Sequence, residues 1–141
     1  MLPLAHIGTA VLASRVARLN VPCAVLGSLA PDLLDKPAAW VVKLTPSGRH
    51  FGHSLLSCVL LSLPLAKCAG ARAGLSFGLG YLSHLLGDSE GPVPWLMPFV
   101  RYDYPQDNRF HLELSRRLLV GEAAGLALIA FFARRRRRGK P

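Results

Sequence analysis

Residues 73–88, AGLSFGLGYLSHLLGD, give the clearest indication of how this chain folds. Leu, Ala and Gly dominate the stretch, and apolar and polar residues do not alternate along it, which favours a helix over a strand. His84 and Asp88 stand four residues apart at its end and so share one helix face. An imidazole and a carboxylate placed in this way can bind the same metal ion.

The same two residues also have a purely structural interpretation. Asp88 could simply mark the end of the helix, and His84 could be a buried histidine with ordinary hydrogen-bond partners. The C-terminal end of a helix is, however, the negative end of its dipole, where Asp88 and Glu90 are unfavourable without a compensating positive charge. A bound cation would supply that charge, so both interpretations stay open at this point.

Four further apolar runs surround this stretch, and none of them alternates in the manner of a strand. They cover residues 2–19, 21–30, 53–66 and 118–133. Pro31 cuts off the second run. The sequence therefore predicts an all-α fold, a compact helical bundle. Residues 91–110, which are rich in Pro, aromatic and charged residues, predict a loop before the last helix, with room for one short helix within it.

The length of 141 residues leaves room for one domain. We expect a single helical domain over residues 1–133 and a basic C-terminal tail over residues 134–141. This tail carries six Lys and Arg residues and so accounts for most of the net charge of +9. A cationic cluster directly after an apolar run favours an anchor for membrane lipids over a nucleic-acid site.

The composition favours a protein that is embedded in a membrane or associated with one. Hydrophobic residues make up 51% of the chain and charged residues 18%, against about 25% charged residues in an average soluble domain. The mean hydropathy of +0.32 points the same way. No run reaches the roughly 18–20 uninterrupted apolar residues that identify a transmembrane helix by themselves. The spacing of the three cysteines indicates neither a disulfide framework nor a cysteine zinc site.

The charged residues fall into two groups if successive runs cross or dip into the membrane in opposite senses. One side then carries Arg15, Arg18, Lys67, Arg72 and residues 134–138. The other side carries His6, Asp32, Asp35, His53, His84 and Asp88. Because positive residues favour the cytoplasmic side, we expect the C-terminal tail there, on a bacterial cytoplasmic membrane, and the His and Asp cluster at the outer face.

Asp32 and Asp35 follow the second apolar run directly. A helix cap would explain Asp32 without a metal, and the neighbouring Lys36 could satisfy Asp35. A carboxylate at the edge of an apolar segment nevertheless needs a partner, and histidines or a divalent cation would serve.

Residues 48–54, GRHFGHS, open the third run. His53 lies nearest the apolar residues and is the better ligand candidate, whereas His50 is expected further from the metal. Arg49 could hold an anionic group such as a phosphate. The alternative is a first helical turn with histidines in solvent. A lone His6 in an apolar run is more often a core residue, but the topology brings it to the same end as the others.

The order and spacing of these residues resemble the YdjM-like family of membrane-bound metal-dependent hydrolases. The resemblance spans residues 5–99 and rests on His6, Pro31-Asp32, Gly52-His53-Ser54, Gly80-Tyr81 with His84 and Asp88, and then Trp95 and Pro98. A weaker resemblance links the chain to the all-helical fold of zinc-dependent phospholipase C and nucleases. Two positions depart from the family pattern: Gly48 replaces a histidine commonly found before the arginine, and Leu34 replaces a second aspartate.

We therefore expect one metal site with one or two ions, ligated by His6, Asp32, His53, His84 and Asp88. Zinc suits mixed imidazole and carboxylate ligands best, with manganese or iron as alternatives. The expected reaction is hydrolysis of a phosphoester, such as a lipid headgroup phosphodiester, with Asp32 or Asp35 as bridging ligand or general base and Arg49 steadying the substrate. The alternative is a non-catalytic membrane protein in which the same residues bind metal or only one another.

Overall fold

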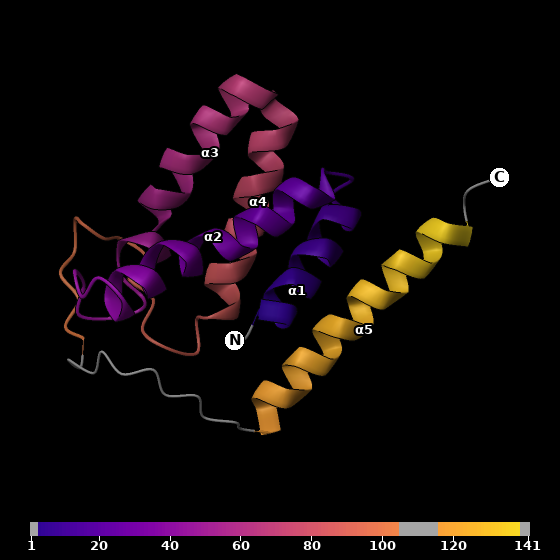
Figure 1. Cartoon of the computed structure of the whole chain (residues 1–141). Coiled ribbons are helices and arrows are strands. Elements are labelled where there is room, and N and C mark those ends of the chain that lie inside the picture. The colour runs from indigo at the N-terminus through magenta and orange to yellow at the C-terminus, as the bar shows by residue number, and fades with distance from the viewer. Residues whose placement is uncertain (1–2, 105–115, 139–141) are drawn as a thin grey trace.

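The computed structural model describes residues 3–104 and 116–138, with side chains described as far as residue 134 in the second range. These residues form helices and no strand, which confirms the expected all-α fold (Figure 1). The elements are α1 (Pro3–Val16), α2 (Val21–Trp40), the short 3₁₀ turn η1 (Phe51–His53), α3 (Leu55–Ala69), α4 (Ala71–Gly87) and α5 (Arg116–Arg138).

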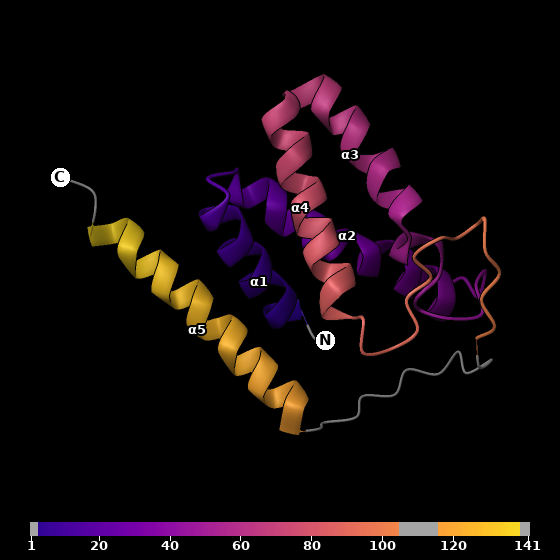
Figure 2. The same ribbon diagram turned by 180° about the vertical axis from the view of Figure 1, so that it is seen from behind.

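Helix α4 lies at the centre of the fold. It packs against α1, α2 and α3, while α5 lies along the outer side of α1 (Figures 1 and 2). Helices α3 and α4 form a hairpin joined at Gly70, whose φ of +89° is a backbone conformation that glycine adopts most readily. The close α2–α4 packing depends on glycines, because a Cβ on Gly80 would lie 1.8 Å from the Ala24 carbonyl oxygen.

The cationic residues of several helices gather at one end of the molecule, as the sequence led us to expect. Arg72 at the start of α4 donates a hydrogen bond to the Arg18 carbonyl at 2.6 Å. Arg15 lies over the Phe132 ring near the end of α5. The beginning of α1 and the end of α4 lie at the opposite end (Figure 1).

Helix α2 continues past Pro31, so the predicted end of the second helix at that residue is wrong. The helix runs nine residues further, to Trp40, and also contains Pro37. Pro31 is fully buried in the packing of α2, and this tertiary packing offsets the backbone hydrogen bond that its ring removes. Asp32 is consequently a residue of the helix interior, not a helix cap, and an i, i+4 ion pair joins it to Lys36.

The third helix begins later than its apolar run. Ser54 is its N-cap and accepts a hydrogen bond from the Ser57 backbone N–H at 3.1 Å, so His53 belongs to η1 and not to the helix. Residues 91–104 of the expected loop contain no helix, and buried Val93 packs in the small core with Tyr81 and Leu85. Residues 105–110 of that loop lie outside the described residues.

The apolar runs were expected to cross the membrane or to dip into it, and the structure does not bear out the crossing. In residues 3–104 and 116–138, no helix is both long enough and apolar enough to cross a membrane. The two helices of the hairpin, α3 and α4, are the most apolar of the bundle and contain 15 and 17 residues.

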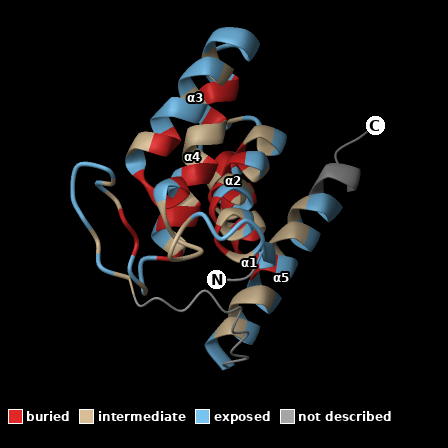
Figure 3. Ribbon diagram, turned by 60° about the vertical axis from the view of Figure 1, so that its left-hand side comes forward, coloured by how far each residue is buried: buried red, intermediate tan, exposed pale blue. Residues whose placement is uncertain are grey.

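The burial pattern is unusual for a soluble protein, because polar side chains fill much of the interior while large apolar ones face outward. The buried residues gather where α1, α2 and α4 meet, and α5 is mostly exposed or intermediate (Figure 3). Fully buried side chains include three histidines, His6, His53 and His84. The outward-facing apolar side chains of the hairpin include Val59, Leu60, Leu63 and Leu75. An apolar surface of this kind indicates contact with another apolar phase.

Glu122 ties the outer helix to the beginning of α1. Its carboxylate accepts hydrogen bonds from the backbone N–H groups of Leu4 at 3.1 Å and Ala5 at 3.0 Å, which otherwise lack partners within the helix. Gly8 and Gly125 allow the two backbones to meet, since a Cβ on Gly8 would lie 2.5 Å from the Gly125 Cα. Helix α5 therefore fixes the segment that carries His6.

The glycine at the α2–α4 contact gives a test of this packing. Gly80→Ala should destabilise the protein by about 1–3 kcal/mol or more, because the new methyl group meets backbone atoms that cannot move aside. Gly121→Ala is the matched control, since its Cβ would lie 3.9 Å from the Ala5 Cβ and alanine favours a helix by about 0.5–1 kcal/mol. Thermal unfolding in detergent measures both, and equal melting temperatures for the two variants would contradict the packing.

Candidate metal centre

Five of the residues singled out in the sequence meet at one end of the bundle. His6 comes from α1, Asp32 from α2, His53 from η1, and His84 and Asp88 from the end of α4. Two overlapping groups of them could hold a metal ion, with ligand atoms all within 4.8 Å of one another. These groups are His6 with Asp32 and His84, and His53 with His84 and Asp88.

The backbone of α2 fixes the orientation of His84. Its Nδ1 lies 2.6 Å from the Ser28 carbonyl oxygen. A carbonyl oxygen can only accept, so Nδ1 carries the proton and donates it. In the neutral ring, Nε2 is then an unprotonated acceptor that points into the cluster, which is the arrangement of a histidine prepared for a metal.

Asp35 fixes His53 in the same sense. The Asp35 carboxylate accepts the His53 Nδ1–H at 2.7 Å and also the backbone N–H groups of His50, Gly52 and His53 at 2.6, 2.8 and 3.1 Å. Gly52 is required for this approach, because a Cβ there would lie 2.8 Å from Asp35 Oδ1. The histidine thus presents Nε2 to the cluster, supported by a carboxylate.

The Nε2 atoms of His53 and His84 face each other at 3.3 Å. Both rings donate their Nδ1 protons elsewhere, so in the neutral rings two lone pairs are directed at one another. A cation between them removes this repulsion, and so does a proton on one ring. The fully buried pair therefore requires either a bound metal or a shared proton.

His6 adds a third buried ring to this pair. Its ring stacks on His84 with the centroids 3.8 Å apart, and among the described residues neither of its nitrogens has a hydrogen bond of good geometry. Its Nε2 lies 3.4 Å from Asp88 Oδ1, close enough for an ion pair if the ring is protonated. A metal ion at the cluster would give the neutral ring a further partner.

The carboxylates lie at distances that suit a shared ion. Asp32 Oδ1 lies 3.6 Å from His53 Nε2 and 3.8 Å from His84 Nε2. Asp88 Oδ2 lies 3.9 and 3.8 Å from the same two nitrogens. A tetrahedral zinc ion with bonds of about 2.0–2.1 Å places its ligand atoms about 3.4 Å apart, so only small shifts would complete a coordination shell.

Each carboxylate also has a cationic neighbour. Lys36 pairs with Asp32, and Arg49 Nη2 lies 2.9 Å from Asp88 Oδ2. Burial raises the pKa of Asp32, but the neighbouring His53 and Lys36 side chains outweigh this effect and lower the pKa to about 2. Burial likewise opposes the ionised form of Asp88, but the His6 contact and the Arg49 charge lower its pKa. Both groups therefore remain carboxylates, as metal ligands must be.

The two facing histidines differ in their affinity for a proton. Burial and the neighbouring His6 lower the pKa of His84 to about 3. Burial acts in the same direction on His53, but its contacts with Asp32 and Asp35 raise its pKa above the usual value. A proton that competes with metal at this cluster would consequently reside on His53.

Some expected residues take other places. Asp35 positions His53, and N–H donors occupy the Asp35 oxygens. Lys36 pairs with Asp32 and not with Asp35. Arg49 contacts Asp88. The His50 ring lies toward Tyr104, 6.1 Å away between centroids.

The supporting roles of two groups were not predicted from the sequence. The Ser28 carbonyl could not be found, because a backbone acceptor leaves no mark on residue type. Tyr81 could have been suspected from its place three residues before His84. Its hydroxyl donates a hydrogen bond to the Gly52 carbonyl and lies 2.8 Å from Ser57 Oγ. These contacts link the segment that carries His84 directly to the segment that carries His53.

The fold and the site together define an all-helical protein with a buried cluster of histidine and aspartate able to hold a metal ion. The family model of the YdjM inner membrane protein matches residues 1–140, and the chain belongs to that family. This membership indicates a membrane location. Neither a curated protein nor a solved structure matches the chain, so the likeness to the phospholipase C fold stays a prediction.

Removing the carboxylate behind His53 should weaken metal binding without removing any proposed ligand. We expect Asp35→Asn to raise the zinc dissociation constant about 10–100-fold, because the ring loses its anionic support and an amide cannot accept every N–H. Competition with a fluorescent chelator measures the constant, and circular dichroism checks the helical content. Asp103→Asn, an exposed loop position, is the matched control. Equal constants for both variants would contradict the positioning role.

Proposed function

We propose that this protein is a metal-dependent hydrolase that cleaves a phosphoester at a membrane. The observation that carries the proposal is the buried His53–His84 pair, whose facing Nε2 lone pairs a bound metal ion would separate. Its support consists of the ligand types, their spacing and the membership of a membrane protein family.

The five residues suit a zinc ion best, with manganese or iron as alternatives, because the set mixes imidazole nitrogen with carboxylate oxygen. His84 belongs to both possible ligand groups, so one ion or two could be held around it. The single free lone pair of His84 Nε2 could bind only one ion, so a second ion would require a carboxylate shared by both. Asp32 and Asp88 are the candidates for that bridging role.

A divalent ion at such a site supplies Lewis acidity, which activates water near neutral pH and polarises a phosphoryl oxygen. The chain supplies positioning. Arg49 lies at the Asp88 edge, where its guanidinium could hold an anionic substrate oxygen. Asp32 is a better candidate than Asp35 for the bridging ligand or base, because four N–H groups already occupy the Asp35 oxygens.

The substrate we propose is a lipid headgroup phosphodiester, and the proposed partner is the membrane itself. Large apolar side chains cover the outer faces of α3 and α4, including Val59, Leu63 and Leu75, and would rest among lipid chains. The cationic end of the bundle with the C-terminal tail would then lie on the cytoplasmic side, and the metal cluster on the other.

One observation favours a second function, a metal-binding or structural membrane protein without catalysis. Lys36 and Arg49 already neutralise one carboxylate each, so the charges of the cluster are compensated with no substrate, and the His84–Ser28 hydrogen bond joins α4 to α2. Gly48 at a position where the family commonly has histidine agrees with this alternative. Activity measurements separate the two functions.

Purified protein in detergent should hydrolyse bis(p-nitrophenyl) phosphate or dihexanoyl phosphatidylcholine after loading with zinc or manganese. Chelation with EDTA should abolish the activity, and added metal should restore it. Asp32→Asn should lower kcat/KM about 100-fold or more, because it alters both a ligand and a proton acceptor. Asp103→Asn should retain activity. If the metal-loaded protein cleaves neither substrate while binding metal fully, the non-catalytic function is the correct one.

A further inference from the structure

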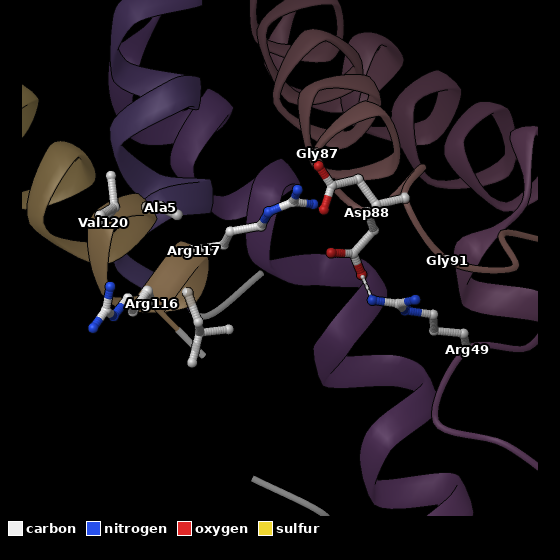
Figure 4. Close-up of a pocket in the computed structure, with 11 residues that line it drawn as sticks. Ala5, Arg49, Gly87, Asp88, Gly91, Arg116, Arg117 and Val120 are labelled. Carbon is white, nitrogen blue, oxygen red and sulfur yellow. Dashed lines mark ion pairs between the residues drawn. The ribbon is translucent and has the colours of Figure 1, made fainter. Parts of the chain in front are cut away.

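A cavity of about 650 Å³ adjoins the metal cluster at its Asp88 edge. It lies between the end of α4 and the first described turns of α5, beside the beginning of α1 (Figure 4). Its volume falls within the range of small-molecule sites. Its charged lining consists of Arg49, Arg116, Arg117, Asp88 and Glu90. Three guanidinium groups against two carboxylates leave one positive charge, which favours an anionic ligand.

Arg49 is held firmly at one edge of this cavity. Its Nη2 lies 2.9 Å from Asp88 Oδ2, and its side chain is only about one-third exposed. A Cβ on Gly91 would lie 2.2 Å from Arg49 Nη1, so the glycine is required for the guanidinium to pass the backbone. The Gly91 N–H in turn donates to the Asp88 carbonyl at 3.0 Å, which closes the turn around the arginine.

Arg117 approaches the same region from the opposite side. Its side chain extends from α5 across the cavity toward Gly87 and Asp88, whereas that of Arg116 is directed away from them (Figure 4). Within the described part of the chain Arg117 forms no ion pair. Two guanidinium groups thus flank one space beside a metal-ligand candidate, and arginine forks bind phosphate oxygens in pairs.

The remaining lining and the rim are apolar. Ala5, Leu118 and Val120 line the cavity, and Val120 is 68% exposed. A soluble anion such as a sugar phosphate would leave these side chains in water, whereas a lipid would cover them.

We propose that this cavity binds the phosphate headgroup of a lipid, with Arg49 and Arg117 holding its anionic oxygens and the apolar rim covering the start of its acyl chains. The inference rests on the proposed function, since it places a lipid phosphate beside the cluster that would cleave its ester. The arginine clamp itself needs no metal, so it can be tested separately.

The test is isothermal titration of detergent-solubilised, EDTA-treated protein with inorganic phosphate and with dihexanoyl phosphatidic acid. Arg117→Ala should raise the dissociation constant of both about tenfold or more, the cost of losing charge-assisted hydrogen bonds. Arg117→Lys should fall between wild type and Arg117→Ala, because it keeps the charge and loses the fork. Arg134→Ala removes the same charge far along α5 and should bind as wild type does.

Equal binding by Arg117→Ala and Arg134→Ala, or no phosphate binding by wild type, would overturn the clamp. The lipid should bind at least tenfold more tightly than inorganic phosphate, and equal affinities would overturn the lipid assignment in favour of free phosphate. Arg117-dependent binding without hydrolysis would refute the proposed function alone. Hydrolysis with phosphate binding unaffected by Arg117→Ala would refute this inference alone.

Discussion

Two buried imidazoles that face each other at 3.3 Å set the main constraint on this structure. The orientation is imposed on both sides, by the Ser28 carbonyl behind His84 and by the Asp35 carboxylate behind His53. Each support lies on α2, so this one helix aims both rings at the same point. Without a metal ion or a shared proton between the rings, this arrangement costs folding free energy. The stacked His6 adds a third buried ring, which has no hydrogen bond of good geometry among the described residues.

The packing around the cluster follows from that arrangement. Small residues bring helices together where the ligands converge, as Gly80 does between α2 and α4 and Gly8 does between α1 and α5. The apolar core is correspondingly small, and many leucines face outward. A soluble protein would bury most of those leucines. Their outward orientation leaves the interior to the polar cluster, and it agrees with membership of an inner membrane protein family.

Much of this could be predicted from the sequence, because helical runs and ligand types leave clear patterns in it. The helix ends were harder: α2 passes through Pro31 because tertiary packing outweighs a lost backbone hydrogen bond. The convergence of the five candidate ligands was predicted, because each lies near an end of an apolar run and the alternating topology puts those ends on one side. These residues are His6, Asp32, His53, His84 and Asp88. The positioning role of Asp35 and the pairing of Arg49 with Asp88 could not be predicted, because both depend on side-chain directions that sequence spacing leaves undetermined.

Metal content tests the central claim most directly. Elemental analysis of detergent-purified wild-type protein should find one or two equivalents of zinc, manganese or iron, and His84→Ala and Asp88→Ala should both lose the metal while keeping their helical content. If the wild-type protein binds none of these metals even after reconstitution, the account is contradicted. The histidines and aspartates would then hold the helices together through a shared proton and ion pairs alone.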